Sequence, residues 1–262
     1  MTIKADINFA CMSLMWGTDL SDFEMQAWVS DVKMAGYHGV ATFESDLIRF
    51  IDKTDFILRL SDNGLSLASV DLVIDRDYDK VKRLCETMQN LGAKHLVMIG
   101  GLAKIGADMD EIAAILNHHG EIALTYNVHA CFHNHFGTIG EALEETEMLV
   151  EKTDPNLFFG FLDVGHATQD FSGHPLAHRA SIFLKRNWER IDFIEFKDWS
   201  EEYKLNTEVG SGVCDYESVF QVLKDRQYSG WITVEQNGPM GNKTPLESAI
   251  ASRDFIRNGF GT

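Results

Sequence analysis

The stretch from residue 127 to residue 141, NVHACFHNHFGTIGE, is rich in residue types that can do chemistry. His129, His133 and His135 stand at alternate positions of a predicted strand, so we expect their imidazoles to leave it on one face. Glu141 follows where a helix pattern starts. Any one of these histidines alone is better explained as a packed core or rim residue. Titratable groups gathered at the C-terminal end of a strand are what the catalytic rim of a parallel α/β barrel requires.

Charged residues also stand at or just beyond the ends of the last four predicted strands. They are Glu141, Asp163, Glu195 with Lys197, and Glu235. In a parallel barrel these ends meet at one rim, although they are far apart in the sequence. Each acid alone is best explained as a strand-end cap or a surface ion pair. Several acids together repel one another unless a cation lies among them, and oxygen-rich sites suit hard divalent ions.

Short β-type runs alternate with longer helical runs about eight times, which predicts a parallel sheet with crossover helices. An eightfold count favours closure into a single (β/α)8 TIM barrel over residues 1–262. The Gly100-Gly101 pair is expected to form a tight turn, and Ser21 with Glu24 to form a capping box. The predicted strands are 7–11, 39–43, 65–72, 95–99, the strand that carries the histidines, 157–163, 191–197 and 231–235. The predicted helices are 21–35, 47–63, 79–91, 108–126, 141–152, 175–186, 216–227 and 245–258.

The composition is that of a globular protein, with 45% hydrophobic residues and a formal net charge of −17. So acidic a chain is expected to bind neither nucleic acid nor an anionic membrane. The N-terminus resembles no signal peptide, and no apolar run approaches a membrane span. The four scattered cysteines are expected to be reduced thiols of a cytoplasmic protein. Four further histidines are expected at the surface: His118, His119, His174 and His178.

Segments of the C-terminal half resemble the xylose-isomerase-like TIM-barrel superfamily of sugar isomerases, epimerases and inosose dehydratases. They are HNHFGTIGE, FLDVGH (161–166), IEFKD (194–198) with EVGSGVCDY (208–216), and WITVEQN (231–237). HNHFGT is most similar to the inosose-dehydratase branch. The resemblance implies a divalent metal, usually Mn²⁺ and with Mg²⁺, Co²⁺ or Zn²⁺ as alternatives. It places Glu141, Asp163 and Glu235 among the ligands, with a histidine expected at position 195.

Position 195 departs from this pattern, because it holds a glutamate. Glu195 could still ligate the metal and make the site more negative, with Lys197 partly neutralising it. Alternatively, Glu195 pairs with Lys197, and the metal is lost or weakened.

The resemblance also implies a chemistry. A metal that bridges a carbonyl and its neighbouring hydroxyl acidifies the carbon-bound proton, and two carboxylates remove and return that proton. The resemblance assigns this acid/base work to Glu141 and Glu235. Lys197 is a further candidate proton donor. His133, His135 and His166 are candidates for holding sugar hydroxyls, and the last two could also donate a proton.

The expected function is a metal-dependent sugar isomerase or epimerase, or an inosose-type dehydratase, acting next to a keto group of a sugar or keto-cyclitol. One alternative is a lyase that cleaves 3-keto-glycosides, with a small partner subunit or as a homo-oligomer. Another is a non-catalytic barrel that binds a sugar-like ligand. A phosphodiesterase of the endonuclease-IV type needs a basic surface, which the charge of −17 disfavours.

Overall fold

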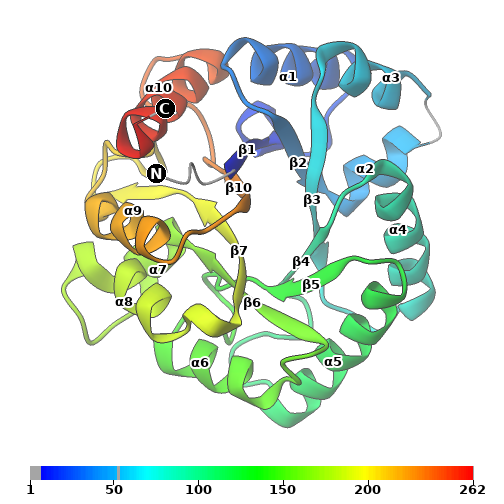
Figure 1. Ribbon diagram of the computed structural model, residues 1–262, viewed down its shortest axis with the longest axis vertical. Helices are drawn as coiled ribbons and strands as arrows, with labels where there is room; N and C mark the ends of the chain where they lie inside the picture. Colours follow the sequence, from blue (N-terminus) through cyan, green and yellow to red (C-terminus); the bar gives the residue numbers. More distant parts are fainter. Residues whose placement is uncertain (1–6, 52–53, 262) are drawn as a thin grey trace.

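Eight parallel strands close into a barrel with helices around it (Figure 1). The computed structural model describes residues 7–51 and 54–261. The strands run in the order β1-β10-β7-β6-β5-β4-β3-β2, and β1 pairs with both β10 and β2. The predicted (β/α)8 barrel is therefore confirmed. The strand bounds are β1 (Ile7–Met12), β2 (Gly39–Phe43), β3 (Ser66–Val73), β4 (His95–Ile99), β5 (His129–Phe132), β6 (Phe158–Asp163), β7 (Ile191–Phe196) and β10 (Gly230–Val234).

The helices form where the apolar periodicity and the caps predict them. The helix bounds are α1 (Asp22–Met34), α2 (Glu44–Ile51), α3 (Thr54–Asn63), α4 (Tyr78–Leu91), α5 (Met109–Thr125), α6 (Leu143–Lys152), α7 (Val164–Asp170), α8 (Arg179–Arg186), α9 (Tyr216–Asp225) and α10 (Pro245–Phe260). The predicted capping box of Ser21 and Glu24 is present, and Thr244 with Glu247 form a second one. Short 3₁₀ turns lie at Ser13–Trp16, Leu176–His178 and Trp188–Arg190.

The structure differs from the predicted elements in four places. The helix expected over 175–186 is a 3₁₀ turn, Leu176–His178, followed by α8. The helix expected over 47–63 is two helices, α2 and α3, and residues 52 and 53 between them lie outside the described residues. The short helix α7 follows β6 directly. A small antiparallel pair, β8 (Asp198–Ser200) and β9 (Lys204–Thr207), follows β7. These short elements lack the length that a periodic pattern needs in order to be recognised.

Gly100 and Gly101 form the predicted tight turn after β4. Both have a left-handed backbone, with φ of 54° and 60°. A Cβ atom at Gly101 would lie 2.1 Å from the carbonyl oxygen of Ile74. The turn therefore requires glycine at position 101 for a steric reason, and it packs the loop after β4 against the loop after β3.

Apolar side chains fill the middle of the barrel. Val97, Cys131, Phe161 and Phe193 form a buried cluster there, at 1% exposure or less, and Phe159 and Trp231 pack against it. A larger apolar core lies between the strands and the helices. The barrel is therefore packed rather than hollow.

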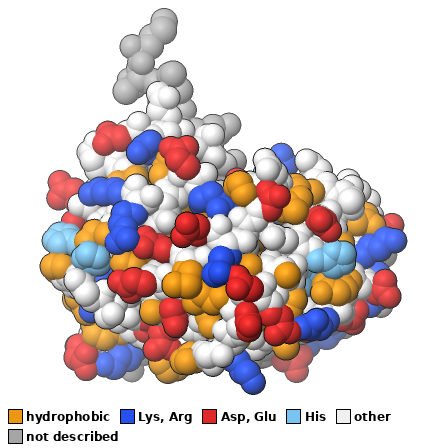
Figure 2. Space-filling view, turned by 90° about the horizontal axis from the view of Figure 1, so that it is seen from below, with side chains coloured by type: hydrophobic (Ala, Val, Ile, Leu, Met, Phe, Trp, Pro, Cys, Tyr) orange, Lys and Arg blue, Asp and Glu red, His pale blue; other side chains and the backbone are white. Residues whose placement is uncertain are grey.

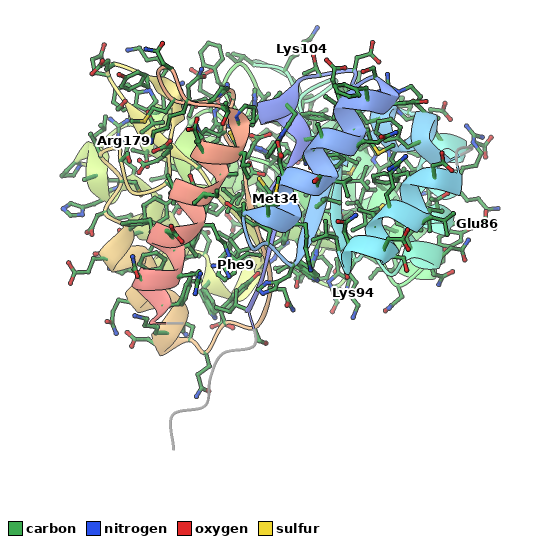
Figure 3. All side chains as sticks on the ribbon, turned by 90° about the horizontal axis from the view of Figure 1, so that it is seen from above. Phe9, Met34, Glu86, Lys94, Lys104 and Arg179 are labelled. Atoms are coloured by element: carbon green, nitrogen blue, oxygen red, sulfur yellow. The ribbon has the colours of Figure 1, made fainter. Side chains whose placement is uncertain are left out.

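Figure 3 marks these two ends, with Lys104 in the loop after β4 at one end and Lys94, just before β4, at the other. On the face shown in Figure 2, acidic side chains are interspersed with lysines, arginines and apolar groups. Within the described part of the chain, no helix combines the length and the hydropathy that crossing a membrane requires.

Candidate functional site

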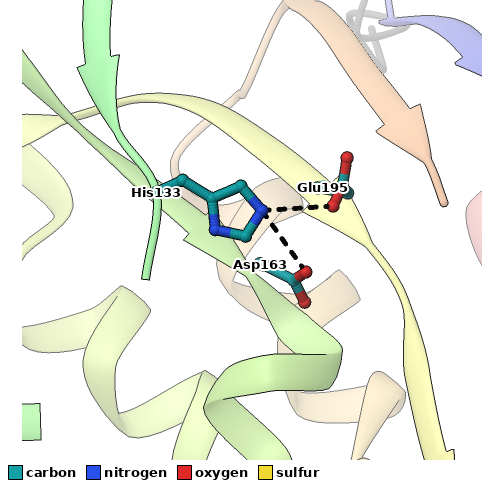
Figure 4. Close-up of side chains that lie close together, drawn as sticks. All are labelled: His133, Asp163 and Glu195. Carbon is teal, nitrogen blue, oxygen red and sulfur yellow. Dashed lines mark ion pairs between the residues drawn. The ribbon is translucent and has the colours of Figure 1, made fainter. Parts of the chain in front are cut away.

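Three side chains meet at the C-terminal ends of neighbouring strands β5, β6 and β7 (Figure 4). They are His133, just beyond β5, Asp163, the last residue of β6, and Glu195 on β7, which is the Cα partner of Asp163. His133 Nε2 lies 3.7 Å from Asp163 Oδ2 and 3.7 Å from Glu195 Oε1. All three residues are at most 2% exposed.

Asn134 fixes the relative position of the first two. Its side-chain nitrogen donates to the carbonyl of Asp163 at 3.0 Å, and its side-chain oxygen accepts from the Asp163 N–H at 2.8 Å. His133 Nδ1 contacts the carbonyl of Asn134 at 2.9 Å, which leaves Nε2 facing the acids. The end of β5 is thereby joined to the end of β6, and the imidazole is held in one orientation.

The atoms that face one another here fit a divalent cation. One atom from each residue lies within 4.8 Å of the other two. Asp163 Oδ2 and Glu195 Oε1 are buried and accept no hydrogen bond, and separations of 3.7 Å from Nε2 are too long for one. Buried carboxylate oxygens without a partner are costly, whereas a nitrogen and two oxygens suit a hard or borderline metal ion.

Three more buried charged residues surround this group. Lys197 is 1% exposed and donates a hydrogen bond to Glu235, which follows β10 and is 6% exposed. Lys197 Nζ also lies 3.8 Å from Asp163 Oδ2. Asp71, on β3 and 5% exposed, feels the charges of both Glu235 and Lys197. Asp71 was not among the residues expected here, although an acid inside the apolar run SLASVDLV is a visible signal. The cluster is therefore richer in carboxylates than expected.

The charges of the cluster shift the pKa values of its members. Burial raises the pKa of Asp163 to about 6, partly offset by the charge of Lys197. Burial and then the facing carboxylates raise the pKa of Glu195 well above its usual value. Burial alone would lower the pKa of Lys197, but the carboxylates of Glu235, Asp163 and Glu195 outweigh it and raise the pKa. An ammonium that is charged at neutral pH thus stands beside acids that are costly to ionise.

Two further histidines line the same end of the barrel. The ring centroids of His135 and His166 are 4.2 Å apart, and those of His133 and His135 are 5.5 Å apart. His166, on α7, places Nε2 4.0 Å from Asp163 Oδ2. Burial lowers the pKa of His166 well below its usual value, so the ring is neutral at neutral pH. The structure therefore brings together the three histidines that were expected to hold substrate hydroxyls.

Glu141 lies outside this cluster. It follows β5 by nine residues, is half-buried, and its Oε2 accepts from the backbone N–H of Gly137 at 2.7 Å. It approaches Asp170 closely enough to raise the pKa of that carboxyl. The structure thus brings Asp163, Glu195, Glu235 and Lys197 together, with His133 beside them, and leaves Glu141 in the neighbouring loop.

His129 does not join the other histidines, because β5 ends at Phe132 and His129 stands at its beginning. It lies near the opposite end of the barrel, where its Nδ1 contacts Asp192 Oδ2 at 2.8 Å. His95 Nε2 contacts the same oxygen at 3.3 Å. The expectation of three imidazoles on one strand face is corrected here: only His133 and His135 come together. The expectation that His119 lies at the surface is also wrong. His119 is fully buried, and burial lowers its pKa to about 4.

The contact of Asp192 with two histidines predicts a pH-dependent contribution to stability. The hydrogen bond to Asp192 raises the pKa of His129. The stabilisation that charged His129 contributes is therefore present below about pH 6.5 and is lost as the pH rises through the folded-state pKa. Burial alone would raise the pKa of Asp192, but the two imidazoles outweigh it and lower the pKa. The stabilisation that ionised Asp192 contributes is present above about pH 4 and is lost as the pH falls through the folded-state pKa of Asp192.

We therefore expect Asp192→Asn to lower the free energy of unfolding by about 1–2 kcal/mol, mostly between about pH 4 and pH 6.5. Urea unfolding of both proteins across this range measures the difference. A difference that is constant from pH 4 to pH 9 would contradict the assigned pairing.

Comparison with known proteins agrees with this architecture. The family model described as xylose isomerase-like TIM barrel matches residues 5–259. An inosose dehydratase from Clostridium tetani is 32% identical over 165 residues, which cover 56% of this chain and 53% of that protein. One from Bacillus cereus is matched over 55% of its length, so the chain spans about half of these two relatives. An inosose dehydratase from Lactiplantibacillus plantarum is 26% identical over 98% of both chains.

Solved structures show the same barrel. A D-allulose 3-epimerase from Methylomonas sp. has a TM-score of 0.78 at 16% identity and covers 99% of this chain and 100% of its own. A xylose isomerase-like TIM barrel protein from Mycobacterium smegmatis in complex with magnesium has a TM-score of 0.73 at 14% identity, covering 97% and 96%. At these identities the likeness establishes the fold alone. The family model matches nearly the whole length, and the chain therefore belongs to the xylose isomerase-like TIM barrel family.

Proposed function

We propose that this protein is a metal-dependent enzyme that removes a proton next to a keto group of a sugar or keto-cyclitol. The observation that carries the proposal is the group of His133, Asp163 and Glu195, in which the facing oxygens Asp163 Oδ2 and Glu195 Oε1 are buried without a hydrogen-bond partner. The inosose dehydratases among the relatives favour a dehydratase, a lyase, as the outcome. A sugar isomerase or epimerase is the second candidate, because it needs the same first proton transfer.

His133, Asp163 and Glu195 would hold the metal, for which we propose Mn²⁺, with Mg²⁺, Co²⁺ and Zn²⁺ as alternatives. When bound, a divalent ion polarises a substrate carbonyl and stabilises negative charge on its oxygen. The glutamate at position 195 thus keeps a ligand where the resemblance expects histidine. His133 supplies a nitrogen donor from just beyond the end of β5.

Glu235 and Lys197 supply the proton chemistry in this proposal. Glu235 is a carboxylate that can accept a carbon-bound proton, and the bonded Lys197 ammonium stabilises negative charge on the substrate oxygen or donates a proton to a leaving hydroxyl. His135 and His166 offer ring nitrogens to substrate hydroxyls. Glu141 enters as the second acid/base group from the family resemblance alone, since its carboxylate lies in the adjacent loop.

Two other activities compete with this proposal. A lyase that cleaves 3-keto-glycosides would use the same proton abstraction, alone or with a small partner subunit or a second copy of the chain. A non-catalytic sugar-binding barrel would not catalyse proton exchange. We propose a cytoplasmic location because the four cysteines are free thiols, three of them buried.

The test is exchange of the substrate's carbon-bound proton with solvent deuterium. Metal-stripped protein reloaded with Mn²⁺ is incubated in D₂O with a panel of ketoses, inososes and 3-keto-glycosides, and NMR follows the loss of the α-proton signal. A dehydratase also produces an unsaturated or diketo product with ultraviolet absorbance, whereas an epimerase does not. Absence of exchange with every substrate class would contradict the enzymatic proposal.

Metal removal supplies a prediction that needs no substrate. Because a bound cation satisfies the buried acids in the folded state only, saturating Mn²⁺ at about 100 times its Kd should add about 2.7 kcal/mol of stability. For a chain of this size that is a rise in Tm of roughly 5–10 °C, measured by calorimetry against protein treated with chelator. An unchanged Tm at millimolar Mn²⁺ would contradict metal binding at this cluster.

A further inference from the structure

An aspartate that the proposed chemistry does not use contacts one of the site histidines. His166 and Asp170 lie one turn apart on α7, and His166 Nδ1 is 3.2 Å from Asp170 Oδ2. Their side chains are 3% and 7% exposed. The other ring nitrogen, Nε2, faces Asp163 Oδ2 at 4.0 Å. The imidazole therefore has a carboxylate on one nitrogen and the candidate site on the other.

Both ends of α7 are held in place, so this contact is well defined. Asp163 caps the helix, because its Oδ1 accepts from the His166 N–H at 2.8 Å. At the other end, Arg179 donates to the carbonyls of Thr168 and Gln169 at 3.0 and 2.8 Å. The Gln169 side-chain amide donates to Asp170 Oδ1 at 2.7 Å. Asp170 thus accepts from Gln169 with one oxygen and faces His166 with the other.

The contact determines which ring nitrogen carries the proton. A neutral imidazole has one N–H, and an ionised carboxylate can only accept, so Nδ1 must donate to Asp170. Burial raises the pKa of Asp170 to about 6, which leaves it ionised at pH 7.5. The backbone N–H of Phe136 also faces Nδ1, at 3.4 Å, but this neutral contact is longer and weaker than a hydrogen bond to a charged carboxylate.

We propose that Asp170 is a positioning residue that fixes His166 in the Nδ1–H form and presents Nε2 to the substrate as a hydrogen-bond acceptor. The inference rests on the proposed function, because it assigns His166 the task of accepting a hydrogen bond from a substrate hydroxyl and so orienting it. The ring stays neutral throughout, and no proton passes to Nε2.

Asp170→Asn tests this assignment, because it keeps the shape of the side chain while its amide can donate to Nδ1. His166 is then driven into the Nε2–H form and loses its acceptor toward the site. We expect the rate of α-proton exchange at saturating substrate to fall about 100-fold, the loss that a misplacement of the reacting group by about 1 Å can cause. KM should change less than about threefold, since Nε2 can still hydrogen-bond a hydroxyl. Asp170→Glu should recover part of the rate.

Two controls separate positioning from a structural effect. Asp215→Asn removes a comparable contact, to His178 Nδ1 at 3.0 Å, outside the described cluster, and should leave the exchange rate unchanged. Asp170→Asn combined with His166→Gln should be no slower than His166→Gln alone, because Asp170 acts through the histidine. Additive losses in the double variant would overturn the proposal.

Nitrogen NMR of ¹⁵N-histidine-labelled protein at pH 7.5 reads the tautomer without any substrate. The wild type should show His166 protonated at Nδ1, and Asp170→Asn should show it protonated at Nε2. The same tautomer in both proteins would overturn the inference, whatever the activity. If the tautomer changes as expected but the wild type exchanges no substrate proton, it is the proposed function that fails.

Discussion

Glu235→Gln is expected to abolish exchange of the substrate's α-proton with solvent deuterium while the barrel stays folded. The neutral amide cannot accept a proton, although it fills the same space and can still hydrogen-bond. Positioned general bases contribute about 10²–10⁴-fold, so we expect a loss of roughly 10³-fold in the exchange rate. Exchange at the wild-type rate would remove Glu235 from the mechanism.

The matched control for this variant is Glu208→Gln. Glu208 is also a buried glutamate at 3% exposure, and both its oxygens accept from Lys243 at 2.7 Å. It follows β9 and bonds Ser248 of α10, so it belongs to a different hydrogen-bond group from Glu235. Glu208→Gln should lower Tm but leave the exchange rate per folded molecule unchanged. Equal losses of rate in both variants would show that breaking any buried glutamate–lysine pair disables the protein.

Glu195→Gln is expected to weaken Mn²⁺ binding by more than 100-fold. The amide offers one neutral oxygen in place of a charged one, and losing a direct ligand should cost more than the roughly 10–100-fold that losing an outer-shell partner costs. Calorimetric titration of metal-stripped protein gives the dissociation constants. Glu195→His, which installs the residue that the family resemblance expects, should retain binding because imidazole suits the same ions.

Glu141→Gln is the control for metal binding. Its carboxylate is occupied by the N–H of Gly137 outside the group of three, so its Mn²⁺ dissociation constant should stay within about threefold of the wild type. A large loss of affinity in Glu141→Gln, with Glu195→Gln unaffected, would show that the metal is held as the family resemblance predicts and not as the structure indicates.

The barrel could be predicted from the sequence because its signals are local and repeated. The strands at 39–43 and 95–99 have the predicted bounds, since β-type residues there are flanked by clear turns. Gly92 ends α4 in a left-handed conformation, as a C-terminal glycine does. The short helix α7 could not be recognised, because its seven residues begin directly at Asp163, which serves both as strand end and as helix cap.

The site was only partly predictable, because it depends on where each strand ends in space. Asp163, Glu195, Lys197 and Glu235 meet as expected, since alternation within parallel strands directs them inward at one rim. His129 was misjudged because it stands at the beginning of β5, near the opposite end of the barrel from His133. Glu141 depends on the loop at Gly137, whose path no periodicity encodes. Asp71 required knowing that β3 also directs a residue toward this cluster.

The most direct test of the account is the position of the bound metal. Crystals soaked in Mn²⁺ and measured for anomalous scattering should show one peak at this end of the barrel, about 2.0–2.3 Å from His133 Nε2, Asp163 Oδ2 and Glu195 Oε1. Solvent or substrate oxygens would complete its coordination. Absence of a peak at saturating Mn²⁺, or a peak that none of these three atoms contacts, would contradict the claim that a cation offsets the crowding of the buried acids.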